Sequence, residues 1–310
     1  MKDIITISTV TFNAIWGEKE KNLEKIIGYI EAAAAKGSNL VLLPEMALTG
    51  YDDEPEKEKK DKMQSILAET IPGPSTDKVA AVTKKLGIYC AFGMPERDPE
   101  DPTTIYNALA IFGPDGLIGS YRKIHLPFPE PHWATRGAGK PFLLDTPWGK
   151  IGLSICYDTY CFPEVMRYEG AMGARIHCNA TALAKCHGKA LGTTTVNAAV
   201  LQNGMYVVSS NLGGVDLYND FWGGSSIIGP SRNLWETHYY AGLPFEDPAA
   251  NECEMYTATI DLSLATGAIF KSNPLIDGAT DFRPDKYIEL YKEVLDNPEF
   301  GAGSGKANQF

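Results

Sequence analysis

The chain alternates short apolar runs with longer segments in which apolar residues recur every three or four positions. Residues 39–43 and 149–156 are almost wholly apolar, a pattern typical of strands that are buried on both faces. Residues 19–35 have the helical spacing and are followed by Gly37, a residue favoured at helix ends. The same criteria predict strands over 4–12, 39–43, 88–94, 106–112, 117–125, 142–145, 149–156, 175–179, 205–211, 225–228 and 255–261, and helices over 19–35, 55–69, 75–86, 189–203, 285–294 and from 163 onward.

The order of these elements favours an α/β protein with mixed sheets and helices outside them. Strands and helices alternate over much of the chain, but the turn sequence Gly113-Pro114-Asp115-Gly116 joins two predicted strands directly as a hairpin. A purely parallel sheet has no such hairpins, because its strands need long crossovers. The composition does not change between residues 1 and 296, so we expect a single domain there and a loose, Gly-rich tail over 297–310.

The composition indicates a globular and acidic protein. Of the 310 residues, 44% are hydrophobic and 22% are charged, and the formal net charge is -11. Such a surface repels polyanions, so we expect no nucleic-acid partner and no anionic membrane. The N-terminus lacks a signal-peptide pattern and no stretch reaches about 18 consecutive apolar residues, so a cytoplasmic location is expected.

Six cysteines are too few for a disulfide framework, so a cysteine in this chain is structural, metal-binding or catalytic. His177-Cys178 and Cys186-His187 are two pairs of neighbouring Cys and His residues. Adjacent residues on a strand point to opposite faces, which makes joint chelation of a metal awkward. We therefore expect no metal and no other cofactor.

Three predicted strands each end in a reactive side chain, namely Glu45, Lys123 and Cys156. Strand ends beside helix starts are where layered α/β proteins gather their sites. A helix N-terminus next to Cys156 is expected to lower the pKa of its thiol. Each residue alone has a simpler interpretation, as a buried cysteine, a surface carboxylate or a solvated lysine. Their occurrence together favours a catalytic set.

The motifs around these three residues resemble those of the nitrilase superfamily of carbon–nitrogen hydrolases. The resemblance extends over residues 4–294, and segments at 198–203, 206–211 and 224–230 also match. Three motifs that occur in the order found in this family are not expected to match by chance. They are Pro44-Glu45 with Leu48-Thr49-Gly50-Tyr51, Tyr121-Arg122-Lys123-Ile124-His125-Leu126, and Cys156-Tyr157-Asp158 with Phe162-Pro163-Glu164.

The resemblance implies a four-layer αββα sandwich with two mixed β-sheets and a triad of Glu45, Lys123 and Cys156. In such a triad Cys156 attacks an amide carbonyl and Glu45 moves the proton. Lys123 and the backbone N–H of Tyr157 then stabilise the oxyanion. The resemblance also implies a homodimer, or a higher homo-oligomer, that forms by packing of the outer helices.

Further site residues are expected around this triad. Many family members carry a second Glu between the Lys and the Cys, and Glu130 is the only Glu in that window, with Asp145 as its competitor. Aromatic residues near the motifs are interpreted either as pocket walls or as half-buried packing residues. The expected pocket residues are Tyr51, Trp133, Asn179 and Ala180.

One departure from the family pattern lies just after the nucleophile. Phe162 follows Cys156 by six residues where the family usually has five, and Cys161 is the apparent extra residue. The roles of residues 159–161 therefore stay open.

A second departure bears on the substrate. Tyr157-Asp158 stands where true nitrilases have Trp-Glu, and no Arg occurs between Cys156 and Arg167 to grip a substrate carboxylate. We therefore expect a hydrolase of small, neutral, linear amides. Hydrolysis of an N-carbamoyl amine or amino acid, hydrolysis of a nitrile, and acyl transfer to an amine are the alternatives. A non-catalytic binding protein of the same fold is the alternative from another class, and the intact triad argues against it.

Overall fold

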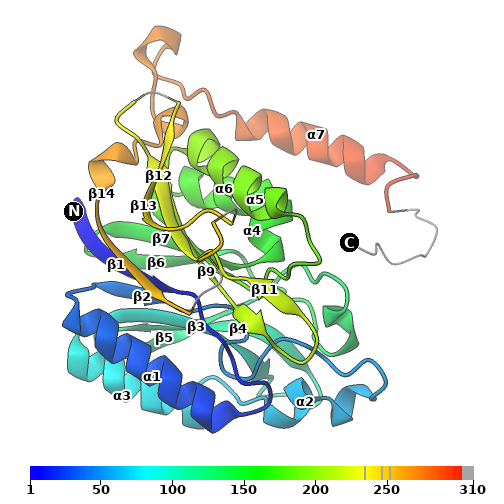
Figure 1. Cartoon of the computed structure of the whole chain (residues 1–310). Helices are drawn as coiled ribbons and strands as arrows, with labels where there is room; N and C mark the ends of the chain where they lie inside the picture. Colours follow the sequence, from blue (N-terminus) through cyan, green and yellow to red (C-terminus); the bar gives the residue numbers. More distant parts are fainter. Residues whose placement is uncertain (234, 246, 251–252, 302–310) are drawn as a thin grey trace.

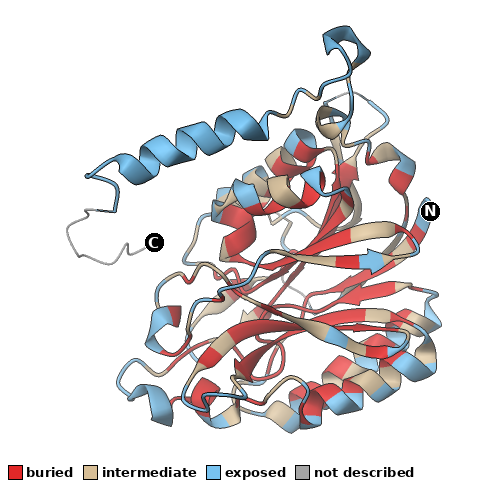
Figure 2. Ribbon diagram, turned by 180° about the vertical axis from the view of Figure 1, so that it is seen from behind, coloured by how far each residue is buried: buried red, intermediate tan, exposed pale blue. Residues whose placement is uncertain are grey.

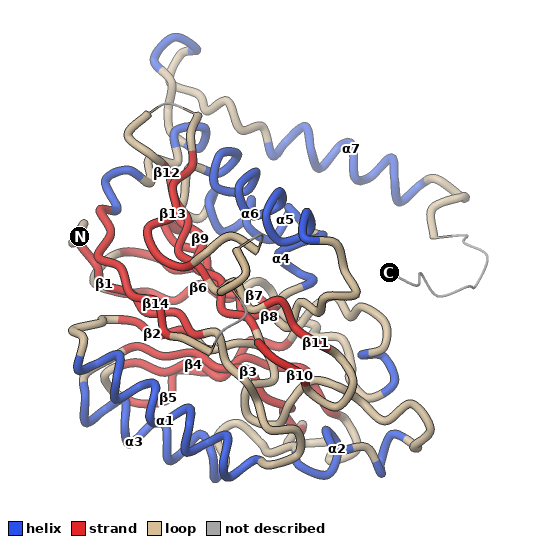
Figure 3. Tube along the Cα trace, viewed as in Figure 1, coloured by secondary structure: helices blue, strands red, loops and turns tan. Residues whose placement is uncertain are grey.

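Two six-stranded β-sheets pack face to face, and helices cover the outer face of each sheet (Figure 1). The computed structural model describes residues 1–233, 235–245, 247–250 and 253–301. Both sheets contain parallel and antiparallel pairs. Figure 3 shows the strands in the middle of the molecule and the helices outside them. The four-layer αββα sandwich with two mixed sheets is therefore confirmed.

The first sheet combines the N-terminal part of the chain with one late strand. Strands β1 to β3 run parallel, and the other members run antiparallel to their neighbours. Helices α1 (Lys19–Ala35) and α3 (Pro74–Leu86) cover its outer face. The strand order is β14 (Met255–Asp261), β1 (Ile4–Val10), β2 (Leu40–Leu42), β3 (Tyr89–Arg97), β4 (Ile105–Gly113) and β5 (Gly116–Arg122).

The second sheet has the same plan, with three parallel strands between antiparallel ones. Helices α5 (Pro163–Ala171) and α6 (Lys189–Asn203) cover its outer face, and α4 (Tyr157–Cys161) leads from the sheet to α5. The strand order is β13 (Thr237–Gly242), β12 (Ser226–Pro230), β9 (Tyr206–Asn211), β8 (Ala174–Thr181), β7 (Gly149–Ile155) and β6 (Phe142–Thr146).

Apolar side chains fill the space between the sheets and the space under the helices. Leu42 of the first sheet and Leu153 and Val208 of the second belong to one buried cluster. Under α1, Ile26 and Ile30 are fully buried in a separate cluster. These two residues are four positions apart, which places them on one face of the helix. The periodicity that predicted α1 therefore reflects the face that the helix buries.

Strand direction brings residues that are distant in sequence to one edge of the first sheet. Strand β5 is antiparallel to β4, which is antiparallel to β3, which is parallel to β2. Strands β2 and β5 therefore run the same way and end at the same edge. Glu45 follows the end of β2 and Lys123 follows the end of β5, while β4 begins at this edge and carries Asn107.

The structure differs from the sequence prediction in the charged segment 55–69. Only the 3-10 turn Lys59–Asp61 and α2 (Met63–Leu67) are helical there. Lys62, which is almost fully buried, donates from Nζ to Asp53 Oδ2 at 2.7 Å. Side-chain bonds to nearby groups offer the chain an alternative to a regular helix, which explains the shortfall. Strand β13 and the separate hairpin of β10 (Gly213–Val215) and β11 (Asp220–Trp222) were also not predicted.

Helix α7 (Pro284–Asp296) stands off the sandwich, and none of its residues is buried (Figure 2). The helix predicted over 285–294 is thus confirmed. Tyr291 of α7 donates a hydrogen bond from its hydroxyl to Glu164 Oε1 on α5. The tail predicted over 297–310 lies, for residues 302–310, outside the described residues. The homodimer expected from the resemblance stays a prediction. No described helix combines the length and the apolar character that a membrane crossing needs.

Gly152 on β7 provides a test of how closely α5 packs on the second sheet. A Cβ at Gly152 would lie 2.0 Å from Glu169 Oε2. Glu169 is fully buried, and the same oxygen lies 2.5 Å from His177 Nδ1. Gly152→Ala should lower the free energy of unfolding by about 3 kcal/mol, because it displaces one partner of a buried pair. Urea denaturation measures this change.

The matched control is Gly28→Ala in α1, where an added Cβ would meet no atom within 4 Å. This substitution should raise the free energy of unfolding by about 0.5–1 kcal/mol, because alanine favours the helix. A Gly152→Ala protein as stable as the wild type would contradict the close packing.

Candidate active site

Cys156 lies at a strained turn between β7 and α4. Its backbone has φ 46° and ψ -97°, a conformation that residues other than glycine rarely adopt. The backbone N–H of Cys156 donates to Ala180 O at 2.9 Å and to Asn179 Oδ1 at 3.1 Å. Both partners are fully buried on β8. The structure thus places Asn179 and Ala180 against the backbone of Cys156, which they hold in its turn.

The expectation that a helix N-terminus lowers the pKa of Cys156 is wrong. Burial raises the pKa of this thiol, the carboxylate of Glu45 raises it further, and the ammonium of Lys123 opposes both. Helix α4 has only five residues, so its dipole is short. The thiol is therefore protonated at neutral pH, and it needs a base that removes its proton as it reacts.

Glu45 and Lys123 form a fully buried ion pair at the edge of the first sheet. Lys123 Nζ lies 2.7 Å from Glu45 Oε1, and Asn107 Nδ2 donates to the same oxygen at 2.7 Å. The other oxygen, Glu45 Oε2, is buried and has no partner among the described residues. Gly93 permits this arrangement, because a Cβ there would lie 2.5 Å from the Cα of Glu45. One side of the carboxylate is held, and the other is free to accept a proton.

Glu130 adds a second carboxylate to the same ammonium. It is fully buried, and its Oε1 lies 2.5 Å from Lys123 Nζ. Burial raises the pKa of Glu130 to about 7, and Lys123 opposes this rise. Burial also disfavours the charge of Lys123, but Glu130 and Glu45 outweigh it, so the pKa of Lys123 is raised. The competitor Asp145 has an 81% exposed side chain and pairs with a lysine on the next strand.

Asn107 is a site residue that the sequence did not single out. Its Nδ2 lies 2.7 Å from Glu45 Oε1 and 3.2 Å from Glu130 Oε2, so one amide bridges the two carboxylates. Asn107 is fully buried in β4. The signal was a lone amide in an otherwise apolar strand, because a buried polar side chain almost always has a partner.

The aromatic residues expected at the pocket take different places. The Tyr51 hydroxyl donates to Glu130 Oε1 at 2.8 Å. Tyr51 therefore belongs, with Glu45, Asn107 and Glu130, to the group around Lys123. Trp133 is only 1% exposed and packs in a small apolar cluster with Met46, the residue after Glu45. Tyr157 begins α4, where backbone N–H groups have no partner within the helix. Contact of Trp133 and Tyr157 with substrate stays a prediction.

Asp158 ties the turn at Cys156 to the segment that carries Lys123. It is fully buried, and its carboxylate accepts from the Tyr121 hydroxyl at 2.6 Å and from the backbone N–H of His125 at 2.9 Å. His125 Nδ1 also lies 2.7 Å from the same carboxylate. Because these residues flank Lys123 on both sides, one carboxylate joins the ends of β5 and β7.

The apparent extra residue falls where α4 ends. Phe162 has φ -124° and ψ 82°, so it separates α4 from α5, and its ring stacks on His125 at 3.5 Å. Cys161 is exposed at this break. Thr159 Oγ1 lies 3.0 Å from His177 Nε2. The interruption of the helix thus accommodates the longer spacing.

His177 packs in the protein interior behind the turn at Cys156. Its Nδ1 lies 2.5 Å from Glu169 Oε2, and both residues are fully buried. Its neighbour Cys178 is also buried. Among the described residues, no group of three or more His, Cys, Asp or Glu is placed to hold a metal ion.

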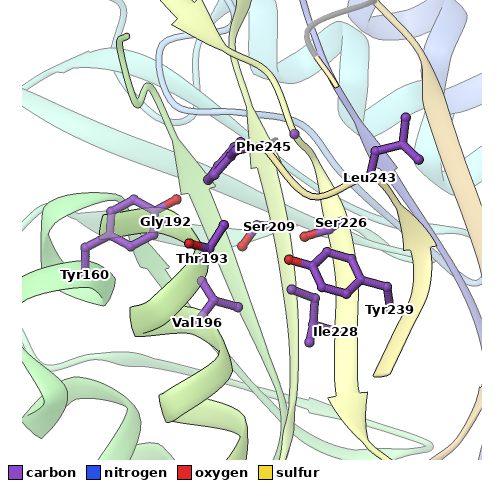
Figure 4. Close-up of a pocket in the computed structure, with 11 residues that line it drawn as sticks. Tyr160, Gly192, Thr193, Val196, Ser209, Ser226, Ile228, Tyr239, Leu243 and Phe245 are labelled. Atoms are coloured by element: carbon purple, nitrogen blue, oxygen red, sulfur yellow. The ribbon is translucent and has the colours of Figure 1, made fainter. Parts of the chain in front are cut away.

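A small cavity adjoins α4 on the helix side of the second sheet. Figure 4 shows hydroxyl-bearing residues around it, among them Tyr160, Thr193, Ser226 and Tyr239. Its volume is about 10 Å³, enough for no more than about one water molecule. An open groove of about 590 Å³ at the end of α6 includes Trp235, and none of its described lining residues belongs to the group around Lys123. The described residues that line these two cavities do not include Glu45, Lys123, Glu130 or Cys156.

Comparison with known proteins decides the family. The family model described as carbon-nitrogen hydrolase matches residues 6–266, most of the chain. The chain belongs to the carbon–nitrogen hydrolase family.

This carbon–nitrogen hydrolase is similar to nitrilases and to amidases. It is 28% identical over 289 residues to a nitrilase of Pyrococcus abyssi, an alignment that covers 93% of this chain and 99% of the relative. It is 32% identical over 225 residues to an omega-amidase of Homo sapiens, with 68% and 76% covered. A solved variant of the amidase from Nesterenkonia sp. AN1 carries the acetamide moiety of fluoroacetamide at its active-site cysteine. That structure has a TM-score of 0.70 at 21% identity and covers 84% of this chain and 92% of its own, which shows a shared fold.

The raised pKa of Cys156 predicts how alkylation depends on pH. Iodoacetamide should inactivate the enzyme with label on Cys156, and the inactivation rate should keep rising with pH beyond the ordinary thiol pKa of about 8.5. A thiol with a lowered pKa would instead give a constant rate above about pH 7. Mass spectrometry of partly inactivated samples locates the label.

The control is Cys253→Ser, which removes an exposed thiol outside the site and should leave the inactivation rate unchanged. Activity loss that tracks label on Cys161 or Cys186 would show that the nucleophile is misassigned.

Proposed function

We propose that this carbon–nitrogen hydrolase cleaves the carbon–nitrogen bond of a small linear amide through a thioester on Cys156. The products are ammonia and a carboxylic acid. The observation that carries the proposal is the free Oε2 of Glu45, whose other oxygen is held by Lys123 and Asn107. A carboxylate fixed on one side and open on the other is suited to take the proton of a neighbouring thiol. The similarity to amidases supports an amide as substrate.

The acylation half of the reaction uses the triad. Glu45 takes the Cys156 thiol proton as the sulfur attacks the amide carbon, and the carbonyl electron pair moves onto oxygen. Lys123 and the backbone N–H of Tyr157 stabilise this oxyanion; loss of one such donor typically lowers the rate about 100- to 1,000-fold. Glu45 then gives the proton to the leaving nitrogen, the carbon–nitrogen bond breaks, and ammonia departs.

The deacylation half repeats the chemistry with water. Glu45 removes a proton from a water molecule as that water attacks the thioester carbon. The second tetrahedral intermediate collapses, the carbon–sulfur bond breaks, and the Cys156 thiol recovers its proton. Lys123 keeps its charge throughout, because its pKa is raised by the two carboxylates that outweigh its burial. An amine acceptor in place of water would give acyl transfer, which uses the same residues.

The surroundings of Cys156 favour a neutral amide over an N-carbamoyl amino acid. Arg167 is the first arginine after the nucleophile. Its guanidinium donates to Gln202 O at 2.8 Å, between the outer helices α5 and α6. Because the Arg167 guanidinium is bound to Gln202 on the outer helices, it does not bind a substrate carboxylate at Cys156.

A panel of substrates tests the function. Small aliphatic amides, N-carbamoyl amines, N-carbamoyl amino acids and nitriles are compared by ammonia release. We expect kcat/KM for the best neutral amide to exceed that for each other class by at least about 10-fold, or about 1.4 kcal/mol of transition-state binding. Mass spectrometry of the product with an added amine separates hydrolysis from acyl transfer. Turnover of nitriles alone would contradict the proposal.

Lys123→Arg separates charge from geometry at the oxyanion. Arginine keeps the positive charge but replaces a compact ammonium by a larger planar group, in a position that is fully buried. We expect kcat to fall by at least about 100-fold, with Cys156 still alkylated by iodoacetamide. The control Lys150→Arg, at a partly exposed surface pair with Asp145, should keep the wild-type rate. A Lys123→Arg enzyme with more than about a tenth of the wild-type rate would show that Lys123 balances charge without binding the oxyanion.

A further inference from the structure

Two carboxylates link the loop that follows β2 to the β10–β11 hairpin. Asp216, between β10 and β11, accepts at Oδ2 from the backbone N–H groups of Tyr51 at 2.6 Å and Asp52 at 2.8 Å. In return, Asp52 Oδ2 accepts from the backbone N–H groups of Tyr218 at 2.7 Å and Asn219 at 2.8 Å. We call Asp52 and Asp216 the reciprocal clamp. Four backbone N–H groups thus donate to two carboxyl groups, which makes the clamp a strong local contact. Burial raises the pKa of Asp216 to about 7, and its hydrogen bonds to the backbone oppose this rise.

The clamp depends on a close approach of the two segments. Gly50 has φ 88°, and a Cβ there would lie 2.7 Å from Asp216 Oδ1. Glycine is the residue that accepts both this φ and this contact. Asp52 is only 1% exposed, so its carboxylate depends on hydrogen bonds within the protein, including one that Asn219 Nδ2 donates to Asp52 Oδ1. The clamp therefore fixes the backbone of Tyr51, which lies between Gly50 and Asp52 in the sequence.

Tyr51 connects the clamp to the group around Lys123. Its hydroxyl donates to Glu130 Oε1 at 2.8 Å, the oxygen that also lies 2.5 Å from Lys123 Nζ. Its ring meets Phe221 of β11 edge-on, with centroids 6.1 Å apart. The hairpin thus holds Tyr51 at both ends, by its backbone through Asp216 and by its ring through Phe221.

We propose that Asp216 is a positioning residue for the reaction, because it holds Tyr51 so that the Tyr51 hydroxyl stays on Glu130. The inference rests on the proposed function, in which the Lys123 ammonium stabilises the oxyanion, and Glu130 Oε1 lies 2.5 Å from that ammonium. Asp216 does not touch the reacting atoms. The groups that face Glu130 are Lys123 from the end of β5, Glu45 from the end of β2, Asn107 from β4 and Tyr51 from the clamped loop.

The pH dependence of the rate reports on this contact. Burial raises the pKa of Glu130 to about 7, while Lys123 and the Tyr51 hydroxyl hold it down against that rise. Without the Tyr51 hydrogen bond Glu130 binds its proton more tightly, so its pKa rises further. Glu130 is then neutral over more of the physiological range, and Lys123 loses a charged partner. The acidic limb of the kcat profile therefore moves to higher pH.

The experiment compares kcat against pH for Asp216→Ala, Asp216→Asn and the control Asp220→Ala on the best amide of the panel. Asp216→Ala should move the acidic limb up by about one pH unit and thereby lower kcat about fivefold at pH 7. Asp216→Asn keeps an acceptor oxygen and should keep the wild-type limb, which also shows that the limb is not the titration of Asp216 itself. Asp220 lies on the same hairpin but pairs with Lys185 at 2.8 Å, so Asp220→Ala should match the wild type.

The route through Tyr51 is tested by a double-mutant cycle. Tyr51→Phe removes the hydroxyl and should itself move the limb by about one pH unit. If Asp216 acts through that hydroxyl, adding Asp216→Ala to Tyr51→Phe should lower kcat by less than about a further twofold. Full additivity, or a uniform fall of kcat with an unmoved limb, would overturn the inference and leave Asp216 a structural residue. Urea denaturation of each variant confirms that it is folded. A wild-type enzyme that releases no ammonia from any amide would instead overturn the proposed function.

Discussion

The ammonium of Lys123 is buried without exposure to solvent, and the rest of the site follows from that constraint. An isolated buried charge is very unfavourable, so it must be met by charged and hydrogen-bonded partners. Glu45 and Glu130 supply two carboxylates within 2.7 Å. Two carboxylates around one ammonium leave an excess negative charge, which Asn107 and Tyr51 offset as hydrogen-bond donors. The carboxylate of Glu45 raises the pKa of the Cys156 thiol beyond the effect of burial, and the ammonium of Lys123 opposes this rise.

Hydrogen bonds from backbone N–H groups to buried carboxyl groups fix the distances between the segments that carry the site residues. The sheets alone place Glu45, Lys123 and Cys156 at strand ends, and packed sheets are separated by about 10 Å. Asp158 joins the end of β7 to the residues on either side of Lys123. Asp52 and Asp216 join the loop after β2 to the β10–β11 hairpin. Buried carboxylates that accept several N–H groups are stiff connectors, because each lost bond leaves an unsatisfied charge.

The sequence was informative where chemistry sits at the end of an apolar run. Glu45 and Lys123 could be expected at one site because each follows a buried strand, and the family motifs around them settled the fold. Asn107 could not be predicted as a site residue, because one amide within β4 has no local signature and its partners are 62 and 23 residues away. Asp216 escaped because its partners Tyr51 and Asp52 lie 165 and 164 residues away. The pKa of Cys156 could not be predicted, since burial depends on packing that only the three-dimensional fold determines.

The charge balance of the site bears on the substrate. With both carboxylates ionised, the group of Glu45, Glu130 and Lys123 carries one net negative charge in a buried environment, where electrostatic interactions are strong. The loop beside it adds the buried carboxylate of Asp52, while the carboxylate of Asp53 is paired with Lys62. An anionic substrate would approach against this field unless a cation met its charge, and Arg167 is committed to Gln202 on the outer helices. A neutral amide meets no such barrier. In the proposed mechanism it becomes negative only as the oxyanion forms, which is when Lys123 binds it. The charge that disfavours an anionic ground state therefore still allows the transition state to be stabilised.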